Sequence, residues 1–250
     1  MRRRAAQKLN ERESRIMAKR QWTANPCGLE ADYETTERVR YETYPWLKRY
    51  LDGVAPLTKG KRVLEIGPGV GTDLKQFARA GAECHAVDIT EGHLEHTAHN
   101  LEIEGYAAGF HHADAVSLPF GDGLFDYVFC NGVLHHIPEA DKVIAEIERV
   151  LKPTGSMYLV VYNKWSWFHL YKILTWPFWR RSYSSHMATV ERGADGVDRK
   201  PYIKLYTRGI LSKLFGDRWE WASWTRTCSP LPDWVGFGGW FHEVVAWRKR

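Results

Sequence analysis

The stretch Val63-Leu-Glu-Ile-Gly67-Pro-Gly69-Val-Gly71-Thr72 decides the fold class of this chain. Its first four residues have the apolar content of a buried strand, and a helical pattern begins at Thr72. Glycines in such a strand-to-helix turn let the backbone bend sharply and approach a ligand closely. The amides at the start of the helix then point at that ligand. A plain tight turn would also use glycine, so the motif alone leaves both interpretations open.

The spacing of the glycines and a nearby acid indicate which kind of ligand would bind. A dinucleotide-binding turn has the pattern GxGxxG, whereas Thr72 holds the sixth place here. Glu65, two residues before the first glycine, places a carboxylate where a pyrophosphate would be repelled. The carboxylate favours a ligand with positive charge, and both features disfavour an NAD-dependent enzyme.

Acidic residues also follow the next two predicted strands. Asp88 comes at the end of the second strand, where a carboxylate can accept both hydroxyls of a ribose. Alternatively, it caps the helix that begins at Thr90 and Glu91. Asp114 follows the third strand and can accept a hydrogen bond from an exocyclic amine such as that of adenine, or it is an ordinary turn residue. Together with the glycine-rich turn, these acids predict a nucleoside site.

Strands and helices alternate around these motifs. The predicted strands cover 63–66, 84–87, 110–112, 127–130 and 157–161, and the helices between them cover 72–80, 91–103 and 139–151. This alternation predicts βαβ units, a parallel sheet and helices on both faces. Helical spacing is also present over 5–21, 33–51 and 207–215, and two further strands are predicted over 219–225 and 241–247.

Several of these stretches resemble the class I S-adenosylmethionine (SAM)-dependent methyltransferases, in the small-molecule branch that includes ubiquinone and menaquinone biosynthesis enzymes. The stretches are 63–71, 86–90, 113–120 and 125–138, with a further match at 148–155. The resemblance covers about residues 60–162. It implies an α/β fold with a Rossmann-like, doubly wound sheet of seven strands whose last strand is antiparallel.

The resemblance also implies which residues would hold SAM. Those beside its methionine and ribose parts would be Glu65, Gly67, Gly69, Gly71 and the backbone of Asn131. Those around the adenosine would be Asp88 on the ribose hydroxyls, Ile89 against the adenine, and Asp114 with the Ala115 backbone at the adenine edge. Residues 63–162 carry 15 Asp and Glu against 5 Lys and Arg, which suits the sulfonium charge of this cofactor.

Methyl transfer depends more on alignment than on proton removal. Alignment can supply ~7–11 kcal/mol of the barrier, whereas a general base typically gives ~10²–10⁴-fold, so a dedicated base is not required. His135 and His136 follow the fourth strand at the ligand-binding edge of such sheets. His135 is the candidate catalytic base, with a structural role as the alternative, and a structural role is favoured for His136. Tyr33, Tyr41, Tyr162 and Tyr206 are further candidates for the cavity wall.

A Trp-rich, basic insertion follows the fifth strand at 163–181. As a helix it has one narrow polar stripe, so more of its surface is apolar than one buried face requires. A lid over an apolar substrate, formed together with residues 15–50, is the first interpretation. A core or dimer contact and peripheral membrane contact are the alternatives.

Composition excludes several classes and sets the expected organisation. At 44% hydrophobic and 26% charged, the chain is globular in type, and no apolar run reaches the ~18 residues of a membrane-spanning helix. No signal peptide is visible, and the four cysteines lack CxxC spacing, which indicates reduced thiols, a cytoplasmic location and no metal site. His93, His96 and His99 are expected to be solvated on their helix. One domain is expected, divided into a cap (1–58), a SAM-binding core (59–162), a lid insertion (163–206) and a C-terminal helix and strands (207–250).

The expected function is methyl transfer from SAM to an apolar or aromatic small molecule that can carry an anionic group. A non-catalytic SAM-binding scaffold is the main alternative, because nothing in the sequence excludes it. The basic flanks of the chain could also meet nucleic acid, but no nucleic-acid-binding module is present, so this is disfavoured. The sequence leaves the acceptor atom and the oligomeric state open.

Overall fold

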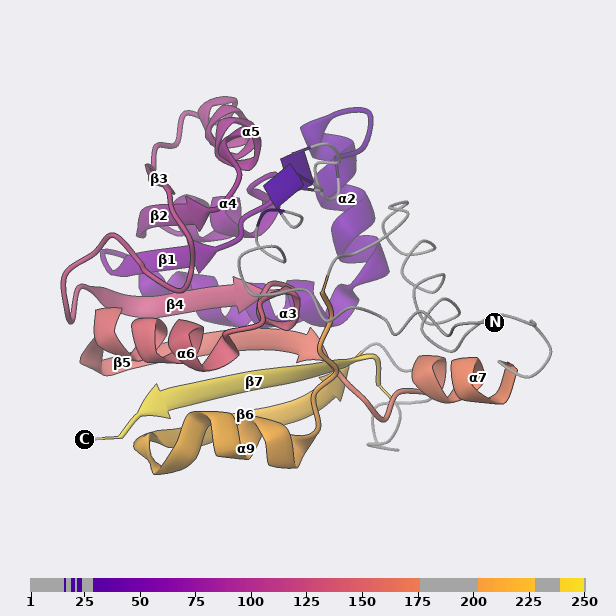
Figure 1. Cartoon of the computed structure of the whole chain (residues 1–250). Helices are drawn as coiled ribbons and strands as arrows, with labels where there is room; N and C mark the ends of the chain where they lie inside the picture. The colour runs from indigo at the N-terminus through magenta and orange to yellow at the C-terminus, as the bar shows by residue number, and fades with distance from the viewer. Residues whose placement is uncertain are drawn as a thin grey trace.

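A computed structural model describes residues 29–175, 202–227 and 239–249, together with Ile16, Lys19, Arg20, Trp22 and Thr23 (Figure 1). Most of the helix expected over 5–21 and of the insertion beyond residue 175 therefore lies outside the described residues, as does Cys27.

Within those residues, seven strands form one sheet in the order β3-β2-β1-β4-β5-β7-β6. The strands are β1 (Arg62–Ile66), β2 (Glu83–Asp88), β3 (Gly109–His112), β4 (Phe125–Asn131), β5 (Leu151–Tyr162), β6 (Trp219–Thr227) and β7 (Phe241–Arg248). The first five pair in parallel, whereas β7 lies antiparallel between β5 and β6. In Figure 1 the yellow arrow of β7 points opposite to its neighbours. The predicted seven-stranded sheet with an antiparallel last strand is confirmed.

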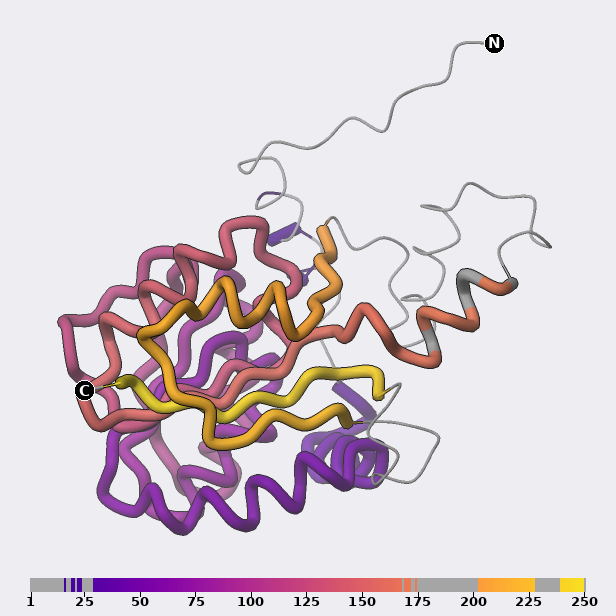
Figure 2. The backbone as a smooth tube through the Cα atoms, turned by 90° about the horizontal axis from the view of Figure 1, so that it is seen from below, coloured from indigo at the N-terminus to yellow at the C-terminus, as the bar shows by residue number. Residues whose placement is uncertain are grey.

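Helices cover both faces of the sheet. On one face lie α3 (Pro45–Val54), α4 (Thr72–Arg79) and α5 (Glu91–Glu102), and on the other lie α6 (Ala140–Val150) and α9 (Arg208–Phe215). Because successive side chains of a strand point to opposite faces, Val63 and Leu64 are both fully buried but belong to different cores. Figure 2 shows α9 and the early indigo helices on opposite sides of β7.

The helical pattern over 33–51 is two helices rather than one. α2 (Tyr33–Thr43) ends and α3 begins on either side of Tyr44, whose backbone has φ −123° and ψ 65°. Proline disfavours the helical conformation in the residue before it, and Pro45 follows Tyr44. The break allows α2 to leave the sheet face covered by α3 and to contact α4 beside the glycine-rich turn.

The strand order places a topological switch point between β1 and β4. The chain proceeds from β1 outward to β2 and β3, then returns to pair β4 with the other side of β1. Open α/β sheets bind ligands at such a point, beyond the carboxyl ends of the strands. The glycine-rich turn follows β1 there, and the turn at Gly132 follows β4.

Candidate active site

A cavity of about 550 Å³ opens at this switch point, within the ~300–1,000 Å³ typical of ligand sites. Its wall includes residues that follow β1, β2, β3 and β4, and also residues of α2. Nine of the ten predicted site residues line it: Glu65, Gly67, Gly69, Asp88, Ile89, Asp114, Ala115, Asn131 and His135. The sequence motifs thus meet around one space.

Two glycines of the glycine-rich turn have different roles: Gly67 lines the cavity, whereas Gly71 lets two helices pack closely. Gly67 has φ +69°, and a Cβ there would lie 2.3 Å from Cγ2 of Val133. Gly71 has φ +78°, precedes α4, and would place a Cβ 2.7 Å from Cγ2 of Thr97 on α5. Gly71 is the one predicted site residue that does not line the cavity. Its glycine permits close packing of α4 against α5 instead of contact with the enclosed space.

Glu65 is a buried carboxylate with unused hydrogen-bonding capacity. It is 3% exposed and lines the cavity, and its Oε2 has no hydrogen-bond partner among the described residues. Burial, and then the nearby Asp73 carboxylate, raise the pKa of Glu65 well above its ordinary value, while Arg40 opposes the rise. A cationic ligand at this wall would offset the cost of the buried charge.

Asp73 and Arg40 form an ion pair that joins α4 to α2. Arg40 Nε donates to Asp73 Oδ1 at 2.8 Å, and a second bond joins Arg40 Nη2 to Asp73 Oδ2. The Asp73 side chain is 2% exposed, whereas that of Arg40 is 31% exposed. The same carboxylate accepts from the Tyr41 hydroxyl and from Asn131 Nδ2. Arg40 therefore presents a fixed guanidinium at the cavity wall, near Glu65.

Asp88 is buried at the end of β2 and is already hydrogen-bonded. Its Oδ1 accepts from the backbone N–H and the hydroxyl of Thr90, at 2.8 and 2.7 Å, and its Oδ2 lies 3.0 Å from Nδ1 of His93. The expectation that His93 is solvated is wrong, because its side chain is only 6% exposed and lines the cavity. On the same helix, His96 is half-buried against Tyr33, and His99 is exposed.

The adenine-side residues lie on the turn after β3. Asp114 and Ala115 line the cavity together with Ala113, and Asp114 Oδ1 accepts from the backbone N–H of Val116 at 3.2 Å. That bond fits the turn interpretation. Ile89 lines the cavity from the loop after β2.

Part of the cavity wall is aromatic. Its lining includes rings from the N-terminal part, α3, β5 and β7: Trp22, Tyr44, Trp46, Tyr162 and Phe241. His135 is 1% exposed, and its ring lies against that of Tyr162 at a tilt of 31°, with the centroids 3.8 Å apart. His136 Nδ1 donates to the Tyr202 carbonyl at 3.2 Å, and its ring meets the edge of Trp22. His136 has the contacts of a residue that holds the loop.

Of the four tyrosines suggested for the cavity wall, only Tyr162 lines it. The Tyr41 hydroxyl bonds to the Thr72 carbonyl and to Asp73, behind the wall. Tyr33 lies against His96, and Tyr206 is fully buried in the core that contains α9.

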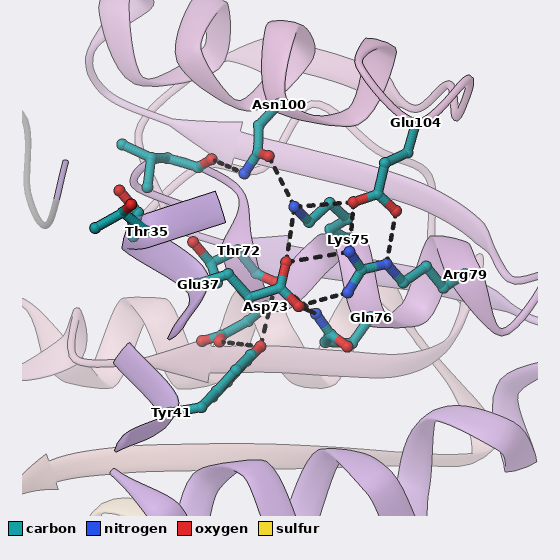
Figure 3. Close-up of polar contacts among 12 residues, drawn as sticks. Thr35, Glu37, Tyr41, Thr72, Asp73, Lys75, Gln76, Arg79, Asn100 and Glu104 are labelled. Atoms are coloured by element: carbon teal, nitrogen blue, oxygen red, sulfur yellow. Dashed lines mark hydrogen bonds and ion pairs between the residues drawn. The ribbon is translucent and has the colours of Figure 1, made fainter. Parts of the chain in front are cut away.

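A polar cluster supports the glycine-rich turn from outside the cavity (Figure 3). Lys75 of α4, whose side chain is 4% exposed, donates to Asn100 of α5 at 3.0 Å and pairs with Glu37 of α2 at 2.8 Å and Glu104 at 3.2 Å. Asn100 Nδ2 in turn donates to the Val70 carbonyl inside the turn, at 2.8 Å. The cluster therefore ties three helices to the backbone of the turn.

The described part of the insertion does not line the cavity. α7 (Trp167–Thr175) follows β5 and extends away from the body of the molecule in both views. Ser166 and His169 are buried, whereas the apolar side chains Trp165, Leu170, Tyr171 and Leu174 are 37–62% exposed. Two members of the predicted polar stripe, Ser166 and His169, therefore face the protein, whereas these four apolar side chains face outward.

No group of three or more His, Cys, Asp or Glu side chains in the described ranges is arranged to hold a metal ion. Over the same residues, no helix has the length and apolar content to cross a membrane. Cys84 and Cys130 are buried free thiols, and burial raises the pKa of each to about 12.

Sequence reasoning missed Arg40, Asp73 and His93. No local signal marks Arg40, because only the turn at Tyr44 brings α2 over the end of β1. His93 did carry a signal, since it lies in the first turn of the helix that follows Asp88 and can therefore reach back to that carboxylate.

Comparison with known proteins agrees with this geometry. Residues 64–159 match the family model described as a methyltransferase domain. A demethylmenaquinone methyltransferase from Clavibacter sepedonicus is 36% identical over 118 residues, which are 47% of this chain and 47% of that protein. The chain thus spans about half the length of the curated relatives it matches. Residues 64–159 are thus similar in sequence to methyltransferase domains, in agreement with the resemblance seen in the sequence.

Solved structures share the fold over most of the chain. A magnesium protoporphyrin IX methyltransferase from Synechocystis PCC 6803 superposes with a TM-score of 0.65 at 17% identity, covering 92% of this chain and 94% of that one. A 1,6-didemethyltoxoflavin-N1-methyltransferase from Burkholderia thailandensis gives 0.64 at 18% identity, covering 98% and 93%. At these identities the match concerns the fold.

Proposed function

We propose that this protein transfers a methyl group from SAM to an apolar or aromatic small molecule that can carry an anionic group. The observation that carries the proposal is that one cavity is lined both by the motif residues and by a set of aromatic side chains. When bound, SAM supplies an electrophilic methyl group on a positively charged sulfur. The protein's own part is to bind, to orient and to exclude water.

The amino-acid part of SAM fits the wall made by Glu65, Thr72 and Arg40. Glu65 Oε2 and the Thr72 hydroxyl are buried and have no partner among the described residues. Glu65 would accept from the ammonium group, and the guanidinium N–H groups of Arg40 not used by Asp73 would bind the carboxylate. This assignment explains why Glu65, an acid whose pKa is raised, and the guanidinium of Arg40 lie together at the cavity wall.

The adenosine part fits the ends of β2 and β3. Asp88 would accept from the ribose and Ile89 would pack on the adenine. Asp114, with the Ala115 backbone, would bind the adenine edge. Gly67, Gly69 and the Asn131 backbone would approach the methionine chain closely, because glycine leaves no side chain in the way.

The acceptor would lie against Tyr162, Phe241 and Trp46. An aromatic wall stabilises a planar or apolar molecule through burial and ring contacts. His135, whose ring lies against that of Tyr162, is the proposed catalytic residue and would take a proton from the acceptor. We expect His135→Asn to lower kcat by ~10²–10⁴-fold if the acceptor must lose a proton, with little change in SAM binding.

Calorimetric titration of SAM tests the cofactor site. Wild-type protein is expected to bind SAM and its product S-adenosylhomocysteine, and Asp88→Ala should weaken both at least ~10-fold because a charged partner of the ribose is lost. Asp122→Ala is the control, since that side chain is 81% exposed and, among the residues that the structure describes, pairs with Arg149. Absence of binding at millimolar SAM, or unchanged binding by Asp88→Ala, would contradict the proposal.

Catalysis is separated from mere binding by the release of S-adenosylhomocysteine. A panel of acceptors that begins with demethylmenaquinone, the compound in a relative's name, should include at least one that yields product. A protein that binds SAM but yields no product with any hydroxylated or aminated aromatic compound would be a SAM-binding scaffold.

The insertion at 163–206 is proposed to serve the substrate rather than the cofactor. Just before α7, the exposed ring of Trp165 lies 5.5 Å from the ammonium of Lys164, and Leu170, Tyr171 and Leu174 on α7 are also exposed. Apolar side chains beside a cation suit the headgroup region of a membrane surface, and they equally suit a lid over an apolar substrate. A cytoplasmic location is part of the same proposal, in keeping with the free thiols Cys84 and Cys130.

A further inference from the structure

Asp88 has too little free hydrogen-bonding capacity to hold a ribose diol alone. A carboxylate has about four acceptor sites, two on each oxygen. Thr90 already uses both sites of Oδ1, through its backbone N–H and its hydroxyl. His93 uses one of the two on Oδ2. One site is left, while the two hydroxyls of a ribose each bring a donor.

The bond between Asp88 and His93 determines what the imidazole offers to the cavity. The carboxylate can only accept, so Nδ1 of His93 must carry the hydrogen of that 3.0 Å bond. In the neutral ring Nε2 is then a lone-pair acceptor. His93 lines the cavity, and its side chain is only 6% exposed. Its Nε2 has no partner among the described residues.

We propose that His93 is a nucleoside-binding residue of this site, and that it shares the ribose diol with Asp88. One hydroxyl donates to Asp88 Oδ2 and the other donates to His93 Nε2. Asp88 has a second role, because it orients the imidazole and fixes its tautomer. The inference rests on the proposed SAM site and adds a residue to it.

Two substitutions separate binding by His93 from mere support of the helix. His93→Asn places an amide donor near the position of Nδ1, so it can keep the bond to Asp88, but it has no atom at the position of Nε2. His93→Gln reaches the position of Nε2 with its amide oxygen and gives up the bond to Asp88. If His93 only supports the helix, His93→Asn should preserve its role better. If His93 binds the ribose, His93→Gln should preserve its role better.

The experiment measures the affinity of S-adenosylhomocysteine and of its 2′-deoxy and 3′-deoxy analogues by calorimetry. His93→Asn should weaken the parent compound about tenfold, as expected for loss of one buried hydrogen bond, and His93→Gln should stay within about threefold of wild type. The Asn penalty should disappear for one of the two analogues, the one that lacks the hydroxyl held by His93. His99→Asn, on the exposed side of α5, is the matched control and should bind all three compounds as wild type does.

Equal penalties for all three compounds, or a His93→Asn protein that binds within twofold of wild type, would overturn the role of His93. Either result leaves the SAM site standing if Asp88→Ala still loses affinity, whereas a wild-type protein that binds none of the compounds overturns both. The ¹⁵N resonance of His93 Nε2 in the wild type gives a readout that needs no variant to fold. It should shift when S-adenosylhomocysteine binds and shift less with one deoxy analogue, and an unchanged resonance would also overturn the proposal.

Discussion

Gly67 shows how a single residue sets the shape of the cavity. Its φ of +69° is strained for any other residue, and a Cβ would lie 2.3 Å from Val133. We expect Gly67→Ala to cost about 1–3 kcal/mol of unfolding free energy from the backbone alone, with a further cost from the contact. Gly53→Ala is the control. A Cβ at Gly53, in α3, would meet no heavy atom within 4 Å beyond its own helix among the described residues, so the alanine should stabilise the protein by about 0.5–1 kcal/mol. Urea unfolding of both variants checks the difference.

Glu65 is predicted to strengthen the binding of SAM and to lower the stability of the protein without a ligand. Its folded-state pKa is raised above its ordinary value of 4.5, so the free protein loses stability as the pH rises from about 4.5 through the folded pKa. Glu65→Gln should therefore raise the Tm of the free protein at pH 7, by about 2–4 °C for each kcal/mol recovered.

The same substitution should weaken SAM binding, because the partner of the ammonium group is lost. Thermal scans at pH 4 and pH 7, with and without S-adenosylhomocysteine, measure both effects. At the lower pH, where Glu65 is protonated, the two free proteins should melt closer together than at pH 7. A Glu65→Gln protein that melts lower at pH 7 and binds SAM normally would contradict both parts.

At the scale of elements, the cluster in Figure 3 is predicted to make the packing of α2 on α4 sensitive to acid. Burial alone would raise the pKa of Glu37, but hydrogen bonds from Arg79, Lys75 and Gln76 outweigh it and lower the pKa. The stability that Glu37 contributes is thus present above about 4.5 and is lost as the pH falls through the lowered folded pKa.

Glu37→Gln should cost about 1–2 kcal/mol at pH 7, and the difference from wild type should shrink below pH 4.5. Glu34→Gln, an exposed site on the same helix, is the matched control and should cost little at either pH. Chemical unfolding at pH 7 and pH 4 gives the comparison. An equal loss for Glu37→Gln at both pH values would show that its contribution is not ionic.

α7 yields a prediction that distinguishes its two proposed roles. If its outward apolar surface contacts a membrane, the protein should sediment with phosphatidylglycerol vesicles, and serine at Tyr171 and Leu174 should reduce that binding several-fold without changing SAM affinity. Leu57→Ser, which alters a 67% exposed leucine in the turn after α3, is the control. Unchanged vesicle binding together with a raised KM for a soluble acceptor would favour the lid.

Particular elements show what the sequence could and could not reveal. The strands from β1 to β4 were predicted to within three residues at each end, because each is a short apolar run bounded by turn residues. β5 begins six residues earlier than expected, at Leu151, since a register shift opposite residues 125–127 of β4 lets the chain around Pro153 continue the strand. The α2–α3 break was missed although Pro45 marks it, because the apolar spacing continues across it.

The site was predictable where it depends on strand ends and unpredictable where it depends on packing between distant segments. Asp88 and Asp114 follow strands, and the parallel order of the sheet brings them together. Arg40 reaches the site only through the ion pair between α2 and α4, which no local pattern encodes. The aromatic wall is likewise assembled from Trp22, Tyr162 and Phe241, which are far apart in the chain.

For the whole molecule, ligand binding should be visible as stability. A ligand that binds only the folded state adds RT ln(1 + [L]/Kd), about 2.7 kcal/mol at one hundred times Kd. S-adenosylhomocysteine should therefore raise the Tm of the wild type progressively with concentration, and Asp88→Ala should need a proportionally higher concentration for the same rise. Differential scanning calorimetry measures both, and a Tm independent of ligand concentration would exclude binding.

The position of β7 between β5 and β6 has a consequence for how the chain folds during synthesis. Synthesis runs from the N-terminus, so β5 and β6 leave the ribosome before residues 241–248, the strand that must enter between them. Until then, the side of β5 that β7 will cover is an open edge with unpaired backbone groups, which is a hazard for association with other chains. The nascent protein thus has an open edge along β5 until residues 241–248 are added.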